Sequence, residues 1–148
     1  MMEFEEICYK PIGVIHSPFK STDETPYQPS AGSEFTAWVE IYKPYTEAIE
    51  GLERHKTIIL VCHLHEVKEK PLKVIPRNKS SIQGVFSTRS PRRPNPIAIS
   101  KVELVEVKDN KIIFRGVDLI DGTPVLDIKP ALDEKFYCAC WFAKYFPT

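Results

Sequence analysis

The amino-acid sequence predicts an all-β fold, in the form of a single closed or nearly closed β-barrel with short helical segments. Thirteen prolines are spread from Pro11 to Pro147, and interior prolines disfavour helices because they remove a hydrogen bond and clash with the preceding turn. Several short segments rich in β-branched or aromatic residues are separated by turn residues. Many short strands with one convincing helix favour a barrel over alternating strands and helices.

Five segments have the composition of β-strands. They are Ile12 to His16, Phe35 to Tyr42, Thr57 to His63, Ala98 to Val107 and Lys111 to Val117. In the fourth segment apolar and charged residues alternate as far as Glu106, where the alternation slips and indicates a β-bulge. Asp109 and Asn110 lie between the fourth and fifth segments and tolerate tight turns, so Ala98 to Val117 is predicted to form a β-hairpin.

The best helical candidate runs from Tyr45 to Arg54 and begins just after Pro44. Proline is favoured at the start of a helix because its missing N–H would have no partner there. Ala48, Ile49 and Leu52 form an apolar stripe at helical spacing. We expect this helix to cover one end of the sheet.

Length and composition predict one globular domain over residues 1–148. A chain of this size can bury a single core, and 43% hydrophobic with 27% charged residues excludes wholesale disorder. The first ten residues lack the pattern of a signal peptide, and no stretch reaches the roughly 20 apolar residues of a membrane span. We therefore expect a cytoplasmic protein whose cysteines are reduced thiols. These cysteines are Cys8, Cys62, Cys138 and Cys140.

The charges are unevenly distributed although the net charge is zero. The segment from Lys68 to Lys101 holds nine basic residues and one acid, Glu69, which leaves 11 basic and 19 acidic residues elsewhere. This pattern fits a basic face for nucleic acid on an acidic body. It also fits solvated side chains that are scattered in three dimensions.

The segment from Gly84 to Ser100, GVFSTRSPRRPNPIAIS, places three arginines among three prolines. Proline restricts its own backbone and that of the preceding residue, so the arginines lie on a preorganised loop. Guanidinium groups pair well with phosphate or carboxylate because their donors are planar and paired. The other interpretation is a rigid solvated connection or a site for a protein partner.

The segment from Asp118 to Pro130, DLIDGTPVLDIKP, contains a predicted tight turn between two strands. Its backbone amides could face a ligand, and Asp118 and Asp121 could bind an amino or hydroxyl group. Carboxylates in turns also cap their own backbone, so both interpretations stay open. Asp127 and Lys129 are spaced to share one face of the following strand.

The sequence lacks the usual motifs for binding metal ions or nucleotides. His63 and His65 share a strand face near Cys62, but four zinc ligands at a recognisable spacing are missing, so no metal site is predicted. There is also no glycine-rich dinucleotide motif, no phosphate-binding Gly-Lys-Ser/Thr loop and no serine nucleophile elbow. If a nucleoside cofactor binds, it uses an unconventional pocket.

The two long segments from Gly84 and from Asp118 closely resemble the TrmO family, also called the TsaA-like or VirR-like family. The resemblance extends to the opening PIGVIHSPFK, to Tyr27-Gln28-Pro29, to the GLE beginning at Gly51 and to the strand ending in Cys62-His63. It implies an S-adenosylmethionine-dependent transfer-RNA methyltransferase with an all-β barrel outside the Rossmann and knotted classes. It also implies a homodimer with the cofactor near the subunit interface.

The activity implied by the resemblance is methylation of the exocyclic nitrogen of threonylcarbamoyl-adenosine, next to the anticodon of threonine transfer RNA. The implied cofactor contacts are Gln28, Pro29, Ser30, Cys62, His63, Arg89, Ile99, Asp118, Leu119, Ile120, Asp121, Gly122 and Thr123. Ser30 departs from the glycine often found in the family, and Cys62 replaces a usual aromatic residue. By this resemblance we expect the compact form of the family, which lacks the extra C-terminal domain of longer bacterial relatives.

Arg92, Arg93 and Asn95 are assigned by hypothesis to the RNA backbone or to the threonyl carboxylate, because an anionic modified base needs a cationic partner. A general base would help to remove the proton of the acceptor nitrogen, and Asp121 and His63 are the sequence candidates. Mere positioning of donor and acceptor is the alternative mechanism. Two other functions stay open: a noncatalytic β-barrel RNA-binding module, and a metal-dependent hydrolase using His63 and His65.

Overall fold

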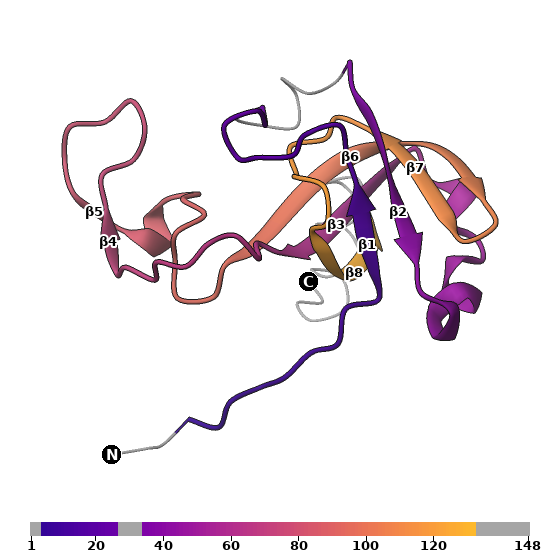
Figure 1. Ribbon diagram of the computed structural model, residues 1–148, viewed down its shortest axis with the longest axis horizontal. Helices are drawn as coiled ribbons and strands as arrows, with labels where there is room; N and C mark the ends of the chain where they lie inside the picture. Colours follow the sequence, from indigo (N-terminus) through magenta and orange to yellow (C-terminus); the bar gives the residue numbers. More distant parts are fainter. Residues whose placement is uncertain (1–3, 27–33, 133–148) are drawn as a thin grey trace, which may run out of the picture.

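A computed structural model describes residues 4–26 and 34–132, and its main feature is a closed six-stranded barrel (Figure 1). The strands are β1 (Gly13–His16), β2 (Thr36–Ile41), β3 (Thr57–His63), β6 (Ile97–Lys108), β7 (Lys111–Arg115) and β8 (Pro124–Pro130). They follow each other around the barrel in the order β1, β2, β7, β6, β3, β8, and β8 closes on β1. All neighbouring pairs are antiparallel. The predicted all-β barrel is confirmed.

The core lies inside the barrel because every strand turns alternate side chains inward. In β3 the inward residues are Ile58, Leu60 and Cys62, all fully buried. Phe114 of β7 and Val125 of β8 meet them in the centre. Gly13 in β1 has a steric role, since a Cβ there would overlap the carbonyl oxygen of Glu40 on β2.

The predicted hairpin and its bulge are both confirmed. β6 and β7 pair across the turn at Asp109 and Asn110, and Asp109 takes the left-handed backbone conformation with φ of 54°. The register shifts between Leu104 and Glu106, where the alternation of the sequence slips. The five predicted strands are found within about one or two residues of their expected ends, a normal margin for strand boundaries.

The predicted helix from Tyr45 to Arg54 is right in position and wrong in form. The segment forms two 3-10 helices, η2 (Lys43–Ile49) and η3 (Leu52–Arg54), separated at Gly51, which has φ of 87°. A left-handed glycine stops a helix at this point. Ile49 is buried and Leu52 packs against the core, whereas Ala48 is exposed, so the apolar stripe is only partly used.

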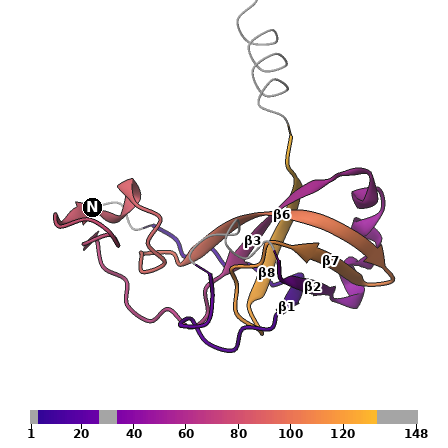
Figure 2. The ribbon, with the colours of Figure 1, turned by 90° about the horizontal axis from the view of Figure 1, so that it is seen from above.

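An arm between β3 and β6 was not predicted as structure. It contains the two-stranded ladder of β4 (Lys73–Val74) and β5 (Gln83–Gly84), followed by η4 (Val85–Ser87). Figures 1 and 2 show this arm extending to one side of the barrel. Strands of two residues are too short to have a periodic signature. No helix in the described part of the chain is long and apolar enough to cross a membrane.

Candidate functional site

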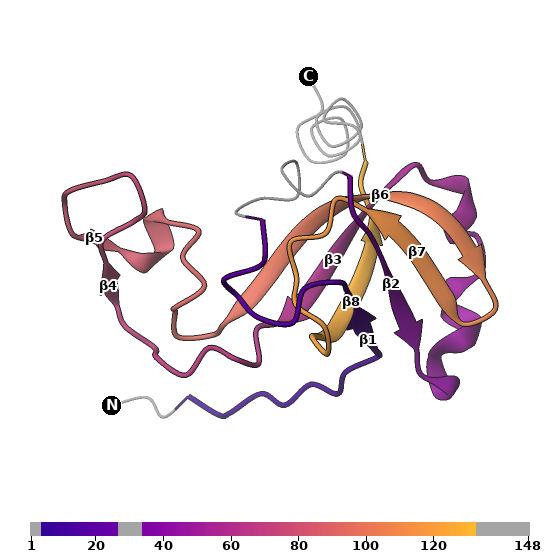
Figure 3. The same cartoon turned by 45° about the horizontal axis from the view of Figure 1, so that its top comes forward.

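The barrel topology brings the predicted site segments to one end, here called the site end. Because neighbouring strands are antiparallel, the last residues of β1, β3 and β7 lie beside the first residues of β2, β6 and β8. The connections after β1 and before β8 lie side by side in Figure 3, and the amide of Asp121 donates to the carbonyl of Phe19 at 2.7 Å. Segments far apart in the sequence therefore share one site.

The barrel wall is incomplete at the site end. β6 pairs with β3 from Ile97 to Glu103, but the described pairing of β6 with β7 begins only at Glu103 opposite Arg115. Within the described part of the chain, residues 97–102 of β6 thus have no strand partner on the side of β7, and this stretch is here called the open edge of β6. Arg89 lies at this edge, where its Nη2 donates to the carbonyl oxygen of Ile99 at 3.3 Å.

Asp118 lies where the chain leaves β7 at this opening. Its Oδ1 accepts a hydrogen bond from the Ser100 hydroxyl at 2.8 Å. Burial raises the pKa of the Asp118 carboxyl above its usual value, while the hydrogen bond from Ser100 and the positive charge of Arg89 act in the opposite direction. The loss of hydration of the carboxylate is therefore only partly offset by the Ser100 hydrogen bond and the Arg89 charge.

Cys62 lies near Asp118 and joins it and Arg89 in a cluster at the open edge. It is fully buried at the end of β3, and burial together with the nearby Asp118 charge raises the pKa of its thiol to about 12. The thiol therefore stays protonated at neutral pH and cannot act as a nucleophile there. The structure thus brings together Cys62, Arg89, Ile99 and Asp118 from the implied cofactor set.

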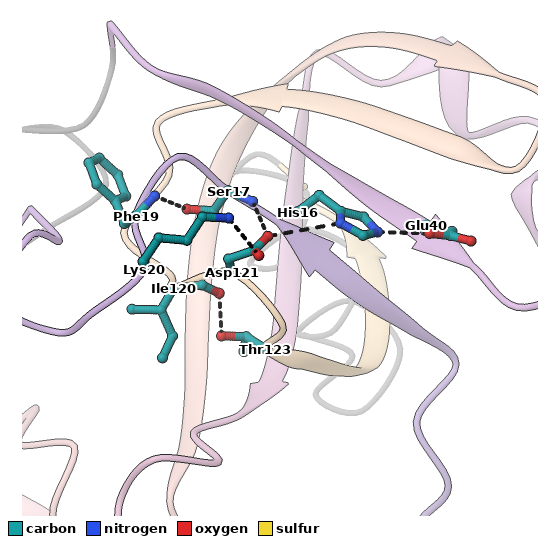
Figure 4. Close-up of polar contacts among 8 residues, drawn as sticks. All are labelled: His16, Ser17, Phe19, Lys20, Glu40, Ile120, Asp121 and Thr123. Carbon is teal, nitrogen blue, oxygen red and sulfur yellow. Dashed lines mark hydrogen bonds and ion pairs between the residues drawn. The ribbon is translucent and has the colours of Figure 1, made fainter.

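Asp121, three residues further on, has a different environment (Figure 4). Its Oδ2 lies 2.8 Å from Lys20 Nζ, and its Oδ1 accepts the backbone N–H of Ser17 at 3.0 Å. The hydrogen bond from Lys20, followed by that from Ser17, lowers the pKa of Asp121. This arrangement ties the turn before β8 to the end of β1 and makes Asp121 a weak proton acceptor.

His16 and its partner Glu40 extend the charged contacts around Asp121. His16 Nε2 lies 2.7 Å from Glu40 Oε2, and His16 Nδ1 lies 3.9 Å from Asp121 Oδ1. The imidazole also stacks on Trp38, with ring centroids 5.0 Å apart and an angle of 21° between the rings. Sequence reasoning did not single out His16 or Glu40, because their pairing depends on the register of β1 and β2.

The backbone amides of the turn before β8 are used within the fold. The amide of Gly122 donates to Ile15 O at 2.8 Å, and the amide of Thr123 donates to Ile120 O at 3.3 Å. With the bond from Asp121 to Phe19, all three amides have internal partners, so the expectation that they face a ligand is wrong for these residues. The side chains of Leu119, Ile120 and Thr123 are buried in the fold.

The three arginines of the segment from Gly84 to Ser100 have different surroundings. Arg93 donates to three backbone carbonyls, those of Thr88, Ser90 and Val85, at 3.1 to 3.3 Å. Arg92 is exposed and pairs with Glu69 at 3.1 Å. The structure therefore makes Arg93 an organiser of its own loop and leaves Arg92 and Arg89 at the surface.

The remaining predicted residues lie apart from this cluster or outside the described chain. His63 is exposed at the end of β3, opposite Ile97 of β6, and Asn95 is exposed before β6. Gln28, Pro29 and Ser30 lie outside the described residues. In the part of the chain that the structure describes, no three His, Cys, Asp or Glu side chains are grouped to hold a metal ion.

A shallow hollow elsewhere on the molecule does not involve these residues. It is lined by residues 53–56 and 104–107. These segments lie at the opposite end of the barrel, near the start of β3 and the bulge of β6. The hollow therefore has no part in the site-end chemistry.

Comparison with known proteins gives a consistent set of matches. Residues 14–135 match the family model described as the tRNA-methyltransferase O N-terminal domain. A probable S-adenosyl-L-methionine-binding protein of Pyrococcus abyssi is 48% identical over 128 residues, which are 86% of this chain and 70% of that protein. The tRNA (adenine(37)-N6)-methyltransferase of Escherichia coli is 40% identical over 134 residues, covering 84% of this chain and 57% of the enzyme.

A solved structure agrees with the described fold. The crystal structure of TrmO from Pseudomonas aeruginosa superposes with a TM-score of 0.74 at 34% sequence identity. The match covers 93% of this chain and 60% of that chain. The barrel and its connections are therefore those of a known fold.

Proposed function

The chain belongs to the family of the tRNA-methyltransferase O N-terminal domain, and on that premise we propose that it is an S-adenosylmethionine-dependent tRNA methyltransferase. The observation that carries this proposal is the cluster of Arg89, Ile99, Asp118 and Cys62 at the open edge of β6. These residues come from three different parts of the sequence and are all in the set that the family resemblance assigns to the cofactor.

The donors and acceptors at the open edge fit the groups of S-adenosylmethionine. The cofactor carries a carboxylate, which suits the exposed guanidinium of Arg89, and an ammonium and ribose hydroxyls, which suit the backbone carbonyls of the open edge. Ile97 and Ile99 are 43% and 57% exposed on the outer face of β6 and offer apolar surface to a purine. When bound, the cofactor supplies an activated methyl group with its own leaving group.

The protein's own contribution is mainly to hold donor and acceptor in line. Such alignment can account for a large part of the acceleration of a two-substrate reaction. Burial raises the pKa of the Cys62 thiol to about 12, which disfavours a methyl relay through this cysteine at neutral pH. Transfer is therefore direct, from donor to acceptor.

The acceptor that we propose is the exocyclic nitrogen of threonylcarbamoyl-adenosine next to the anticodon of threonine tRNA. The activity named for the Escherichia coli relative, tRNA (adenine(37)-N6)-methylation, supports the adenine nitrogen and its position. The threonyl group adds a carboxylate to the base, and Arg89 and Arg92 are exposed cations close to the site end. Basic residues of the arm, Lys70 and Lys73 among them, are exposed and suit the RNA backbone.

We also propose that the protein acts as a homodimer in the cytoplasm. The arm exposes four large apolar side chains, which is more than a solvated connection needs. They are Leu72, Ile75, Ile82 and Phe86. A second copy of the chain is the proposed cover for them. Sedimentation equilibrium would give a mass of one chain if this proposal is wrong.

Calorimetric titration with S-adenosylmethionine tests the proposed function. We expect saturable binding by the wild-type protein and a loss of about tenfold or more in affinity for Arg89→Ala. Arg92→Ala serves as the matched control for removal of a surface arginine and should bind the cofactor as the wild type does. Absence of binding, also with RNA present, would instead support a noncatalytic RNA-binding barrel.

Methyl transfer tests the acceptor. Purified threonine tRNA with and without the threonylcarbamoyl group should be incubated with radiolabelled cofactor, and methylation should occur only on the modified RNA. Equal methylation of both RNAs would mean that the modification is not required. A noncatalytic module with exposed aromatic residues such as Trp38 would bind RNA and transfer no methyl group.

A further inference from the structure

The acceptor nitrogen of the proposed reaction carries a proton that must leave when the methyl group arrives. This nitrogen lies between a purine ring and a carbamoyl group, so its electron pair is delocalised and a base would assist the transfer. The described site end contains several groups that could accept a proton. They are Asp118, Asp121, His16 and His63.

Three of these groups are poorly suited. Asp121 is held by Lys20 and by the Ser17 amide, and its pKa is lowered. His16 is bonded through Nε2 to Glu40 and stacked on Trp38, so one ring nitrogen and one ring face are already engaged. His63 lies at the exposed end of β3 opposite Ile97, on the other side of β6 from β7 and from Asp118, which follows β7.

Asp118 has both the position and the environment of a base. It follows β7 at the opening of the barrel wall, and its Oδ1 is oriented by the Ser100 hydroxyl at 2.8 Å. Among the described residues, Ser100 is the one side chain that hydrogen-bonds this carboxyl. The charged or titratable groups that face it are Arg89, from the loop before β6, and Cys62, from β3.

The electrostatic balance at Asp118 is that of a group prepared to take up a proton. The positive charge of Arg89 favours the ionised carboxyl. Arg89 also donates to the Ile99 carbonyl, and no close ion pair between Arg89 and Asp118 is found among the described residues. The fully buried Cys62 remains neutral and adds no competing charge. Burial makes the charged carboxylate less stable than it would be in water, which raises its affinity for a proton.

We propose that Asp118 is the general base of the methyl transfer, an inference that rests on the proposed function. In this step the N–H bond of the acceptor breaks and its proton moves to a carboxylate oxygen of Asp118. The electron pair of the nitrogen forms the new N–C bond, and the S–C bond of the methyl donor breaks with its electrons moving to sulfur. Asp118 then returns the proton to water.

The rate of a single turnover with modified tRNA tests this role. Asp118→Asn keeps the size and the hydrogen bond to Ser100 but cannot accept the proton, so the rate should fall by about 100-fold or more, the usual contribution of a base. The matched control is Asp109→Asn in the hairpin turn at the other end of the barrel, where Asn tolerates the positive φ of this residue. This control should have the wild-type rate.

The pH profile separates a base from a binding group. The wild-type rate should rise with pH as Asp118 loses its proton, and this limb should be missing from Asp118→Asn. Ser100→Ala removes a hydrogen bond that lowers the pKa of Asp118, so it should move the limb to higher pH and leave the plateau rate nearly intact. A profile that is the same for all three proteins would overturn the proposal.

Two measurements do not depend on activity. A carbon-13 titration of labelled aspartate carboxyls should give Asp118 a pKa above the usual range, and Ser100→Ala should raise it further. Cofactor affinity of Asp118→Asn should stay within about threefold of the wild type. A loss of affinity equal to the loss of rate would make Asp118 a cofactor ligand and not a base.

The outcomes also distinguish this inference from the proposed function. If the wild-type protein transfers no methyl group to any tRNA, the proposed function fails and the role of Asp118 fails with it. If the wild type is active and Asp118→Asn is equally active, only the role of Asp118 is wrong. If Asp118→Asn does not fold, the shift of the pH limb and of the carboxyl pKa in Ser100→Ala still decides the question.

Discussion

The two ends of the barrel satisfy their polar groups in different ways. At the end opposite the site, the hairpin turn is short and self-contained: the Asn110 side chain donates to Ile41 O at 3.1 Å, and Ile41 donates to Asn110 O at 2.8 Å. Ile49 from η2 covers this end with a buried apolar side chain. At the site end, Asp118 is partly buried beside the stretch of β6 that lacks pairing with β7. The first arrangement favours stability, and the second retains a chemically reactive group at a cost in stability.

Within the site end, Asp118 and Asp121 repeat this contrast at close range. Both belong to one connection, but Asp121 is paired with Lys20 and its pKa is lowered, whereas burial raises the pKa of Asp118. The paired carboxylate anchors the turn, and the desolvated one is available for chemistry. Substitutions at both ends can test whether stability and function are separated in this way.

The largest expected loss of stability comes from Ile49→Ala at the end opposite the site. Removal of this buried side chain should lower the free energy of unfolding by roughly 2–4 kcal/mol, because it leaves a cavity above the core. Urea unfolding followed by fluorescence measures this change. Cofactor affinity of the folded variant should equal that of the wild type, and a reduced affinity would show that the two ends are coupled.

A smaller loss is expected from Arg93→Ala in the loop of the site end. Arg93 holds three backbone carbonyls, so its removal should lower the free energy of unfolding by about 1–2 kcal/mol. Arg92→Ala is the matched control, because its ion pair with Glu69 is exposed and such pairs contribute about 0–1 kcal/mol. Equal losses in thermal unfolding would contradict the organising role of Arg93.

The smallest effect is expected from Asp121→Asn and depends on pH. The lowered pKa of Asp121 means that its carboxylate stabilises the folded state. That contribution is fully present above the unfolded pKa, near pH 4, and is lost as the pH falls through the lowered folded value. We expect a loss of about 0.5 kcal/mol at pH 7 for this exposed pair, which should shrink below pH 4 in thermal unfolding. A difference that grows in acid would contradict this sign.

The strands could be predicted from the sequence because their signals are local. The alternation in β6, its slip near Glu106 and the turn at Asp109 each depend on neighbouring residues only, and all three are found in the structure. The helix was predicted with the wrong form, since the left-handed Gly51 divides it into two 3-10 helices. The arm with β4 and β5 could not be predicted, because its ladder pairs two short segments that are separated by a loop.

The sequence named candidate site residues, but it could not predict which of them lie together. The two conspicuous segments supplied Arg89 and Asp118, which the structure brings together. Their partner Ser100 was not singled out, because a serine inside a strand has no distinctive pattern. Arg93 was assigned by hypothesis to the RNA backbone or the threonyl carboxylate, and the structure adds that it bonds three carbonyls of its own loop. Asp121 was a candidate base, and the structure adds that it is paired with Lys20. Sequence spacing does not tell which cation lies beside which anion.

The sequence by itself determined the all-β character, the hairpin and the family, because residue periodicity, turn chemistry and ordered motifs are properties of the chain read along its length. Tertiary structure alone decided that the barrel wall opens beside Ser100 and that Asp118 and Asp121 have opposite pKa shifts. The physical reason is that burial and neighbouring charges set the proton affinity of a carboxyl group. Both are created by strands and loops that meet only when the barrel closes.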